Sequence, residues 1–240
     1  MKKIDTALIL AGGKGTRFSE YTDKIPKPMI EAKSKPLLVH IMNIYLKQGV
    51  KKFIILSGYK SDYIKNYFET NKNEFFNIEL TVLDTGLQTQ TGGRVKRALN
   101  LISDEYFYLT YGDGLGNINL ENLTNFHFKN ETIGTLTAVR PPARFGSLEI
   151  NSESYVSEFG EKNNANEGWI NGGFFVLNKK ISEYIEDDNT PLEKSPLEHL
   201  AKIKQLKAFK HDGFWRPVDT IRELEILESE MDQKLFAYYE

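Results

Sequence analysis

Ala7-Leu-Ile-Leu-Ala-Gly-Gly-Lys-Gly-Thr-Arg17 joins a short apolar run to a loop with three glycines. The first five residues are continuously apolar, which is typical of a buried strand in a parallel sheet. Glycine is needed where a side chain would block close approach or where φ is positive. A loop of this kind, placed before a helix, turns backbone N–H groups toward a bound phosphate. The stretch therefore predicts a buried strand that ends in a candidate phosphate-binding loop.

Outward from this loop, apolar runs alternate with helical patterns. In the first half, strands are predicted at 7–11, 52–57, 79–84 and 106–111, and helices at 36–48, 61–69 and 93–102. This order favours an α/β fold with a Rossmann-like, mostly parallel sheet flanked by helices. In the second half, strands are predicted at 132–139, 147–150, 155–159 and 169–177, and helices at 179–186, 196–204 and 219–236. The later strands indicate a small, partly antiparallel β elaboration, and with no long linker we expect one domain over residues 1–240.

Composition excludes several classes of protein. The 240 residues carry a net charge of −2, which is unlike the basic excess of proteins that coat nucleic acid. Because the chain has no cysteine, disulfides, thiolate catalysis and cysteine-ligated zinc are excluded. The N-terminal apolar run is too short for a signal peptide, and no run approaches the roughly 18 apolar residues of a membrane span. We expect a cytoplasmic protein with no nucleic-acid or membrane partner.

The glycine loop does not match the commoner phosphate-binding motifs. A dinucleotide fingerprint that begins at Gly13 finds Gly15 but meets Phe18 at its third glycine position. A Walker A loop would need Gly-Lys-Ser or Gly-Lys-Thr after a four-residue gap, and this is absent. Arg17 adds a planar guanidinium that suits phosphate oxygens. From these residues alone, a plain strand-to-helix turn remains an alternative.

A proline-braced lysine follows the loop in Ile25-Pro-Lys-Pro-Met29. The two prolines fix an extended backbone, and we expect them to hold Lys27 outward. Lys27 is either a surface lysine or a second cation for the same phosphates.

Asp113 stands between two glycines at the end of a predicted strand. Ligands of open parallel sheets gather at the carboxyl ends of strands. Mg²⁺ that accompanies a triphosphate takes only one or two protein carboxylates. Asp113 is therefore a candidate metal ligand, although aspartate in such a position also shapes turns.

Two motifs together, Leu10-Ala-Gly-Gly-Lys-Gly-Thr-Arg17 and Pro26-Lys-Pro-Met29, resemble the signature of the sugar-phosphate nucleotidyltransferases. Weaker similarities favour the branch of the glucose-1-phosphate cytidylyltransferases. They are Asp84-Thr-Gly86, Thr91-Gly-Gly-Arg94, Thr110-Tyr-Gly-Asp-Gly114, Arg144-Phe-Gly146, Glu161-Lys162, Ile170-Asn-Gly-Gly-Phe-Phe-Val176 and Gly213-Phe-Trp-Arg-Pro-Val-Asp-Thr220.

The resemblance implies transfer of a cytidylyl group from CTP to a sugar 1-phosphate, with glucose 1-phosphate as the expected acceptor and Mg²⁺ as the cofactor. It implies catalytic roles for Arg17 and Lys27, and Mg²⁺ ligation by Asp113 and Asp219. The implied nucleotide-binding residues are Leu10, Ala11, Gly12, Gly13, Gly15, Thr16, Arg17, Thr91, Gly92, Gly112 and Asp113. The implied sugar-phosphate-binding residues are Gly146, Glu161, Lys162 and Asn171. A homo-oligomer of unspecified size is also expected.

Other interpretations of these residues stay open. Asp219 is equally suited to cap the last predicted helix, Glu161-Lys162 to lie on a solvated surface, and Arg94 with Arg97 to form a solvated helix face. Alternative substrates are another base, a heptose 1-phosphate or a phosphorylated non-sugar. A noncatalytic nucleotide-binding regulatory protein is a further alternative, and an NAD-dependent oxidoreductase a weaker one. Two features depart from the family pattern: Ile25 replaces a second lysine, and residues 69–77 are shorter than the family's insertion, which puts oligomerisation in doubt.

Overall fold

β1 (Thr6–Ala11) lies inside the central sheet of the protein, whose computed structural model describes residues 3–18, 22–141, 147–160 and 168–232. It pairs in parallel with two other strands, β4 (Lys52–Ser57) and β6 (Tyr106–Tyr111). β5 (Glu79–Asp84) pairs in parallel with β4 and forms one edge. Parallel strands end at the same edge of a sheet, so the loops after β1, β4, β5 and β6 meet there.

The second half of the chain extends the same sheet. β11 (Ile170–Asn178) runs antiparallel between β6 and β8 (Gly134–Val139), and β12 (Leu206–Lys210) pairs in parallel with β8. The order of the seven strands is β12-β8-β11-β6-β1-β4-β5. The predicted α/β class with a mostly parallel sheet is confirmed, and β11 carries the antiparallel part.

Two apolar cores lie on the two faces of this sheet, because side chains alternate along each strand. In β1, Ala7, Ile9 and Ala11 face one core, whereas Leu8 and Leu10 face the other. The first core is completed by α2 (Leu37–Leu46), α3 (Ser61–Thr70), α5 (Leu120–Asn130) and α7 (Ile221–Asp232). The second is completed by α4 (Thr91–Ala98), α6 (Ser195–Lys202) and the 3-10 helix η6 (Lys179–Tyr184).

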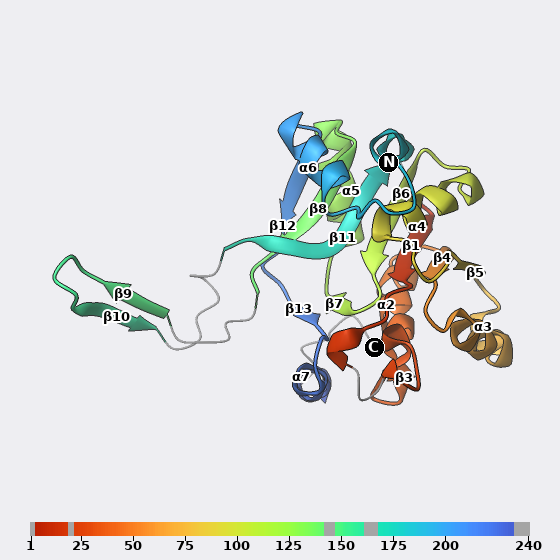
Figure 1. Ribbon diagram of the computed structural model, residues 1–240, viewed down its shortest axis with the longest axis horizontal. Helices are drawn as coiled ribbons and strands as arrows, with labels where there is room; N and C mark the ends of the chain where they lie inside the picture. Colours follow the sequence, from red (N-terminus) through yellow and green to blue (C-terminus); the bar gives the residue numbers. More distant parts are fainter. Residues whose placement is uncertain (1–2, 19–21, 142–146, 161–167, 233–240) are drawn as a thin grey trace.

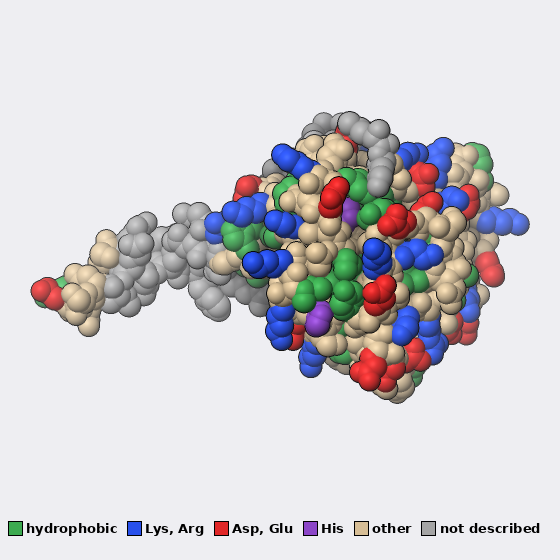
Figure 2. Space-filling model, turned by 90° about the horizontal axis from the view of Figure 1, so that it is seen from above, with side chains coloured by type: hydrophobic (Ala, Val, Ile, Leu, Met, Phe, Trp, Pro, Cys, Tyr) green, Lys and Arg blue, Asp and Glu red, His purple; other side chains and the backbone are tan. Residues whose placement is uncertain are grey.

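Three short strand pairs complete the fold. β2 (Glu31–Ala32) pairs with β3 (Lys35–Pro36), and the hairpin of β9 (Ser147–Ile150) and β10 (Val156–Gly160) extends away from the body (Figures 1 and 2). β7 (Gly114–Gly116) pairs antiparallel with β13 (Trp215–Pro217), where Pro217 lies opposite Gly114. This last pair brings the segment before α7 beside the loop after β6.

Several elements differ from the sequence-based predictions. The helix predicted at 179–186 is the short 3-10 helix η6, which buries only Ile181 and so has little apolar surface to stabilise a longer α-helix. α5, β12 and β13 were not predicted. The first residues of α5 are fixed by Asn119, whose Oδ1 accepts a hydrogen bond from Asn122 N at 2.8 Å. Within the described residues, none of the helices combines the length and the apolar character needed to cross a bilayer.

Candidate active site

A cleft of about 330 Å³ opens beyond the carboxyl ends of β1 and β6. Lys27 and Asp219 line its wall, together with most of the residues that were predicted to bind the nucleotide. These nucleotide-binding candidates are Leu10, Ala11, Gly12, Gly13, Gly15, Thr16, Thr91, Gly112 and Asp113. Gly92 lies behind this wall, where its backbone N–H donates to Thr190 O at 3.0 Å. Segments that are far apart in the sequence thus surround one cavity.

Some predicted site residues lie outside the described part of the chain. Gly146, Glu161 and Lys162 belong to segments that the structure does not describe, and so does the side chain of Arg17. The backbone of Arg17 lies in a 3-10 turn, η1 (Thr16–Phe18), which directly follows the glycine loop.

Two glycines of the loop are required by the backbone or by a close neighbour. Gly15 has φ +61°, a left-handed conformation that side chains disfavour. At Gly12 a Cβ atom would lie 2.1 Å from Nη1 of Arg94, so only glycine fits above this guanidinium. A Cβ atom at Gly13 would meet nothing within 4 Å.

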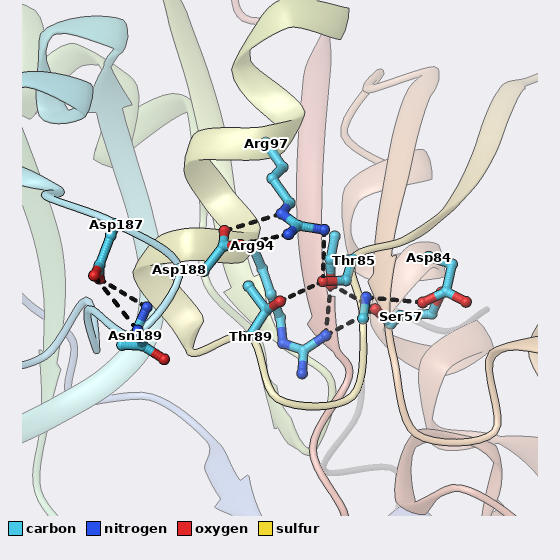
Figure 3. A network of polar contacts seen from close by, with 10 residues as sticks. Ser57, Asp84, Thr85, Thr89, Arg94, Arg97, Asp187, Asp188 and Asn189 are labelled. Atoms are coloured by element: carbon cyan, nitrogen blue, oxygen red, sulfur yellow. Dashed lines mark hydrogen bonds and ion pairs between the residues drawn. The ribbon is translucent and has the colours of Figure 1, made fainter.

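Arg94 supports the glycine loop from below. Its guanidinium donates to Ser57 O at 2.8 Å and Thr85 Oγ1 at 2.5 Å (Figure 3). It also donates to Gly12 O at 3.2 Å. Arg94 is 4% exposed. Burial lowers the pKa of Arg94, while Asp84 acts in the opposite direction; a guanidinium nonetheless stays charged.

Interpreting Arg94 as part of a solvated helix face was therefore wrong. Gly92 and Gly93 let the start of α4 pack closely against the segment that holds Asp188 and Thr190, and this turns Arg94 inward. Arg97 is the partly exposed member of the pair and binds the carboxylate of Asp188. Two adjacent glycines before the arginine were the sequence signal for this close packing.

Replacing Gly12 with alanine is expected to destabilise the fold, because the new methyl group displaces the Arg94 guanidinium from its acceptors. The loss of one hydrogen bond to a charged group predicts a decrease of about 1.5–3 kcal/mol in the free energy of unfolding. Gly13→Ala is the matched control and should stay within about 1 kcal/mol of the wild type. Urea denaturation measures both, and equal unfolding free energies for the two variants would contradict the role of Arg94.

Lys27 lies at the floor of the cleft between two carboxylates. Its Nζ is 2.6 Å from Asp113 Oδ2 and 2.6 Å from Asp219 Oδ1. The residue is 8% exposed, so the expectation that the two prolines hold it outward was wrong. Lys27 begins a 3-10 turn, η2 (Lys27–Met29), which directs its side chain into the cleft. Burial by itself lowers the pKa of Lys27, but Asp113 and Asp219 outweigh it and raise the pKa above its usual value.

The pairing of β7 with β13 places Asp219 opposite Asp113. Val218 N donates to Asp113 O at 2.9 Å, which fixes the two chain segments side by side. Asp219 directs one carboxylate oxygen to Lys27, and the hydroxyl of Thr220 caps α7, since its Oγ1 accepts from Glu223 N at 3.2 Å. Asp219 is thus placed in the cleft, while its neighbour provides a cap for the helix.

The two carboxylates could hold one metal ion. Both contact the same nitrogen atom, so their oxygens converge on one point. Among the described residues, no cluster of three or more histidine, aspartate or glutamate side chains could hold a metal. A pair of carboxylates suits Mg²⁺, which keeps several waters or phosphate oxygens as its other ligands.

Tyr111, the last residue of β6, lines the cleft, and β11 pairs with β6 beside it. Asn171 Nδ2 donates to the Tyr111 hydroxyl at 3.3 Å, and Asn171 Oδ1 accepts from Gly173 N at 2.9 Å. Trp215 Nε1 donates to Gly172 O at 2.8 Å and holds β13 against this strand. Asn171 therefore has a fixed amide orientation beside the cleft.

Glu193 is a residue of this region that the sequence did not reveal. Its carboxylate accepts from Thr91 Oγ1 at 2.6 Å and from the Tyr111 hydroxyl at 2.7 Å. Burial, and after it the charge of Glu193, raise the pKa of Tyr111, so the hydroxyl stays protonated and donates. A single glutamate in a polar loop carries no local signal that marks such a contact.

Comparison with known proteins gives consistent matches. Residues 6–227 match the protein-family model described as nucleotidyl transferase. The chain is 42% identical over 242 residues to a glucose-1-phosphate cytidylyltransferase of Salmonella typhimurium, covering 92% of this chain and 94% of that protein. It is 42% identical over 237 residues to a probable glucose-1-phosphate cytidylyltransferase of Bacillus subtilis, with coverage of 91% and 92%. The crystal structure of HddC from Yersinia pseudotuberculosis complexed with GMP-PN is similar at a TM-score of 0.74 and 27% identity, over 95% of this chain and 100% of that chain.

Proposed function

Because this chain belongs to the nucleotidyl transferase family, we propose that it transfers a cytidylyl group from CTP to glucose 1-phosphate, giving CDP-glucose and pyrophosphate. The observation that carries the reaction is the meeting of Lys27, Asp113 and Asp219 beneath the glycine loop. The substrates follow from the relatives at 42% identity. A sheet that runs unbroken from β5 to β12 supports the further proposal that residues 1–240 act as one domain.

The proposed step is an in-line displacement at the α-phosphorus of CTP. An oxygen of the sugar 1-phosphate forms the new bond, and the bond to pyrophosphate breaks. A phosphate monoester is largely ionised at neutral pH, so no strong general base is needed. Catalysis then depends on positioning and on neutralisation of charge. In this proposal the amides of Gly12, Gly13 and Gly15 and the side chain of Arg17 bind the leaving phosphates, and Lys27 stabilises charge at the α-phosphoryl group.

Asp113 and Asp219 are the proposed ligands of Mg²⁺. Their converging oxygens fit an ion that takes two carboxylates and completes its shell with phosphate and water. When bound, Mg²⁺ acts as a Lewis acid that neutralises phosphate charge. Lys27 contacts the same two oxygens, so its ammonium group is positioned to move from carboxylate to phosphate when nucleotide enters.

The acceptor is proposed to bind along β11. Asn171 has one N–H and one carbonyl lone pair left for sugar hydroxyls after its contacts with Tyr111 and Gly173. Gly146, Glu161 and Lys162 are proposed to complete this half, with Lys162 at the phosphate of the acceptor.

The experiment that tests the function offers the protein each of the four ribonucleoside triphosphates with Mg²⁺ and glucose 1-phosphate. We expect pyrophosphate release with a kcat/KM for CTP at least about a hundredfold above that for UTP, since a site built for one hydrogen-bonding pattern rejects the other. Mass spectrometry should identify CDP-glucose. Equal rates with UTP, or faster release with mannose 1-phosphate as the acceptor, would assign other substrates. Tight CTP binding without pyrophosphate release from any acceptor would favour a noncatalytic regulatory protein.

A further inference from the structure

Glu193 lies beside the cleft and contacts two residues that line it, Thr91 and Tyr111. One carboxylate oxygen, Oε2, accepts from Thr91 Oγ1 at 2.6 Å, and the other, Oε1, accepts from the Tyr111 hydroxyl at 2.7 Å. Thr91 is the first residue of α4 on the nucleotide side, whereas Tyr111 is the last residue of β6. A single side chain therefore joins two elements that contact the cleft from different directions.

The contact continues from Tyr111 to the acceptor side. A tyrosine hydroxyl has one proton, and here that proton goes to Glu193, so the oxygen offers only lone pairs to Asn171. The amide nitrogen of Asn171, at 3.3 Å, must therefore be the group that faces Tyr111. The carbonyl of Asn171 is then directed to Gly173 N. Glu193, through Tyr111, thus acts together with Gly173 N to fix which end of the Asn171 amide faces Tyr111.

The contact on the other side fixes Thr91 in the same way. The hydroxyl of Thr91 gives its proton to Glu193 and accepts from Leu192 N at 2.8 Å. This holds the first turn of α4 against the loop that carries Glu193. The proton and one lone pair of the Thr91 hydroxyl are therefore used, and its orientation is determined.

We propose that Glu193 is a positioning residue that aligns the nucleotide half of the cleft, through Thr91, with the acceptor half, through Tyr111 and Asn171. The inference rests on the proposed function, which places the nucleotide in the cleft that Thr91 lines and the sugar phosphate at Asn171. In-line displacement needs both reactants held in one geometry, and small misplacements are costly. Glu193 can align the two reactants because one of its carboxylate oxygens accepts from Thr91 and the other accepts from Tyr111.

Three substitutions separate the two arms of this contact. Thr91→Val breaks the nucleotide arm and should raise the KM for CTP about tenfold, with the KM for glucose 1-phosphate close to wild type. Tyr111→Phe breaks the acceptor arm and should raise only the KM for glucose 1-phosphate, by a similar factor. Glu193→Ala breaks both arms and should raise both values. Glu198→Ala, an exposed glutamate on the adjacent α6, is the matched control and should change neither.

The double variant Tyr111→Phe/Glu193→Ala distinguishes this positioning from independent contacts. If Glu193 acts on the acceptor through Tyr111, the double variant should have a KM for glucose 1-phosphate no higher than the larger single value. Multiplying effects would overturn the proposal, and so would equal changes in both KM values for all three single variants, which would indicate general loosening. Melting temperatures within a few degrees of wild type should accompany the expected pattern.

Turnover assays of the wild-type protein in the same series test the proposed function separately. If it turns over a different triphosphate or sugar phosphate, the selective KM pattern is expected with that pair. If it turns over none, calorimetric dissociation constants for CTP and glucose 1-phosphate replace the KM values. A Glu193→Ala variant with both constants unchanged would then refute the positioning role.

Discussion

Lys27→Met should lower kcat at least about a hundredfold while the chain stays folded, because removing one preorganised donor costs about 3–4 kcal/mol of barrier. Lys27 Nζ is a cationic group at the floor of the cleft and lies 2.6 Å from a carboxylate oxygen of each of the two aspartates. Methionine retains much of the side-chain volume without the charge. Pyrophosphate release at saturating substrates measures the effect, and wild-type turnover in this variant would exclude a catalytic role for Lys27.

The neighbouring Lys24 provides the matched control. It is exposed and belongs to the same loop, so Lys24→Met should retain turnover within about twofold of wild type if the effect is local to the cleft. The Lys27→Met variant is also expected to bind Mn²⁺ more tightly than wild type in the absence of nucleotide. Its carboxylates no longer hold an internal cation, and electron paramagnetic resonance of free Mn²⁺ measures the difference. Weaker Mn²⁺ binding in the variant would contradict the view that Lys27 and the metal share Asp113 and Asp219.

Asp113→Asn should reduce Mg²⁺-dependent turnover about a thousandfold, since a Lewis acid at a phosphoryl group contributes several kcal/mol. Asparagine keeps the shape of the side chain and an acceptor for Lys27, but loses the charge that a hard cation requires. A titration of kcat/KM against Mg²⁺ concentration measures the loss. We expect that raising Mg²⁺ restores only a small part of the rate.

Asp62→Asn is a suitable control for the removal of one negative charge. Asp62 lies in the first turn of α3 with its side chain 92% exposed, and its substitution should leave the Mg²⁺ titration unchanged. An Asp113→Asn protein with a titration that overlays the wild type would remove Asp113 from the proposed metal site.

The sheet was the part of the fold that local sequence predicted best. β4, β5 and β6 were predicted with the bounds that the structure has, because each is a short run of strand-forming residues that ends at polar or glycine-containing turns. β12 and β13 were missed. β12 has no fully buried residue and no regular alternation at the edge of the sheet, and β13 has only three residues, one of them proline. Such strands form because they pair with a neighbouring strand that is already in place. A local sequence pattern does not reveal that neighbour.

The residues of the cleft were likewise predicted only in part from the sequence. The type of residue at Lys27, Asp113 and Asp219 was evident from the sequence, but the inward direction of Lys27 was not. It depends on two ion pairs that span 86 and 192 residues. The buried position of Arg94 was missed for a related reason, since its acceptors Ser57 and Gly12 lie 37 and 82 residues away in the sequence. Contacts between residues so far apart in the sequence depend on how the helices and strands pack together.

The sequence by itself determined that a buried strand ends in a glycine loop, and its motifs identified the family, which the comparisons confirm. These properties are local, because they need only an apolar run, glycine at positions that exclude side chains, and a few fixed spacings. Only the tertiary structure decided that β13 joins β7, so that Asp219 meets Asp113 across Lys27. It also placed Glu193 between Thr91 and Tyr111. The physical reason is that these contacts form when the sheet order and the two cores bring distant segments together, and no single segment encodes that meeting.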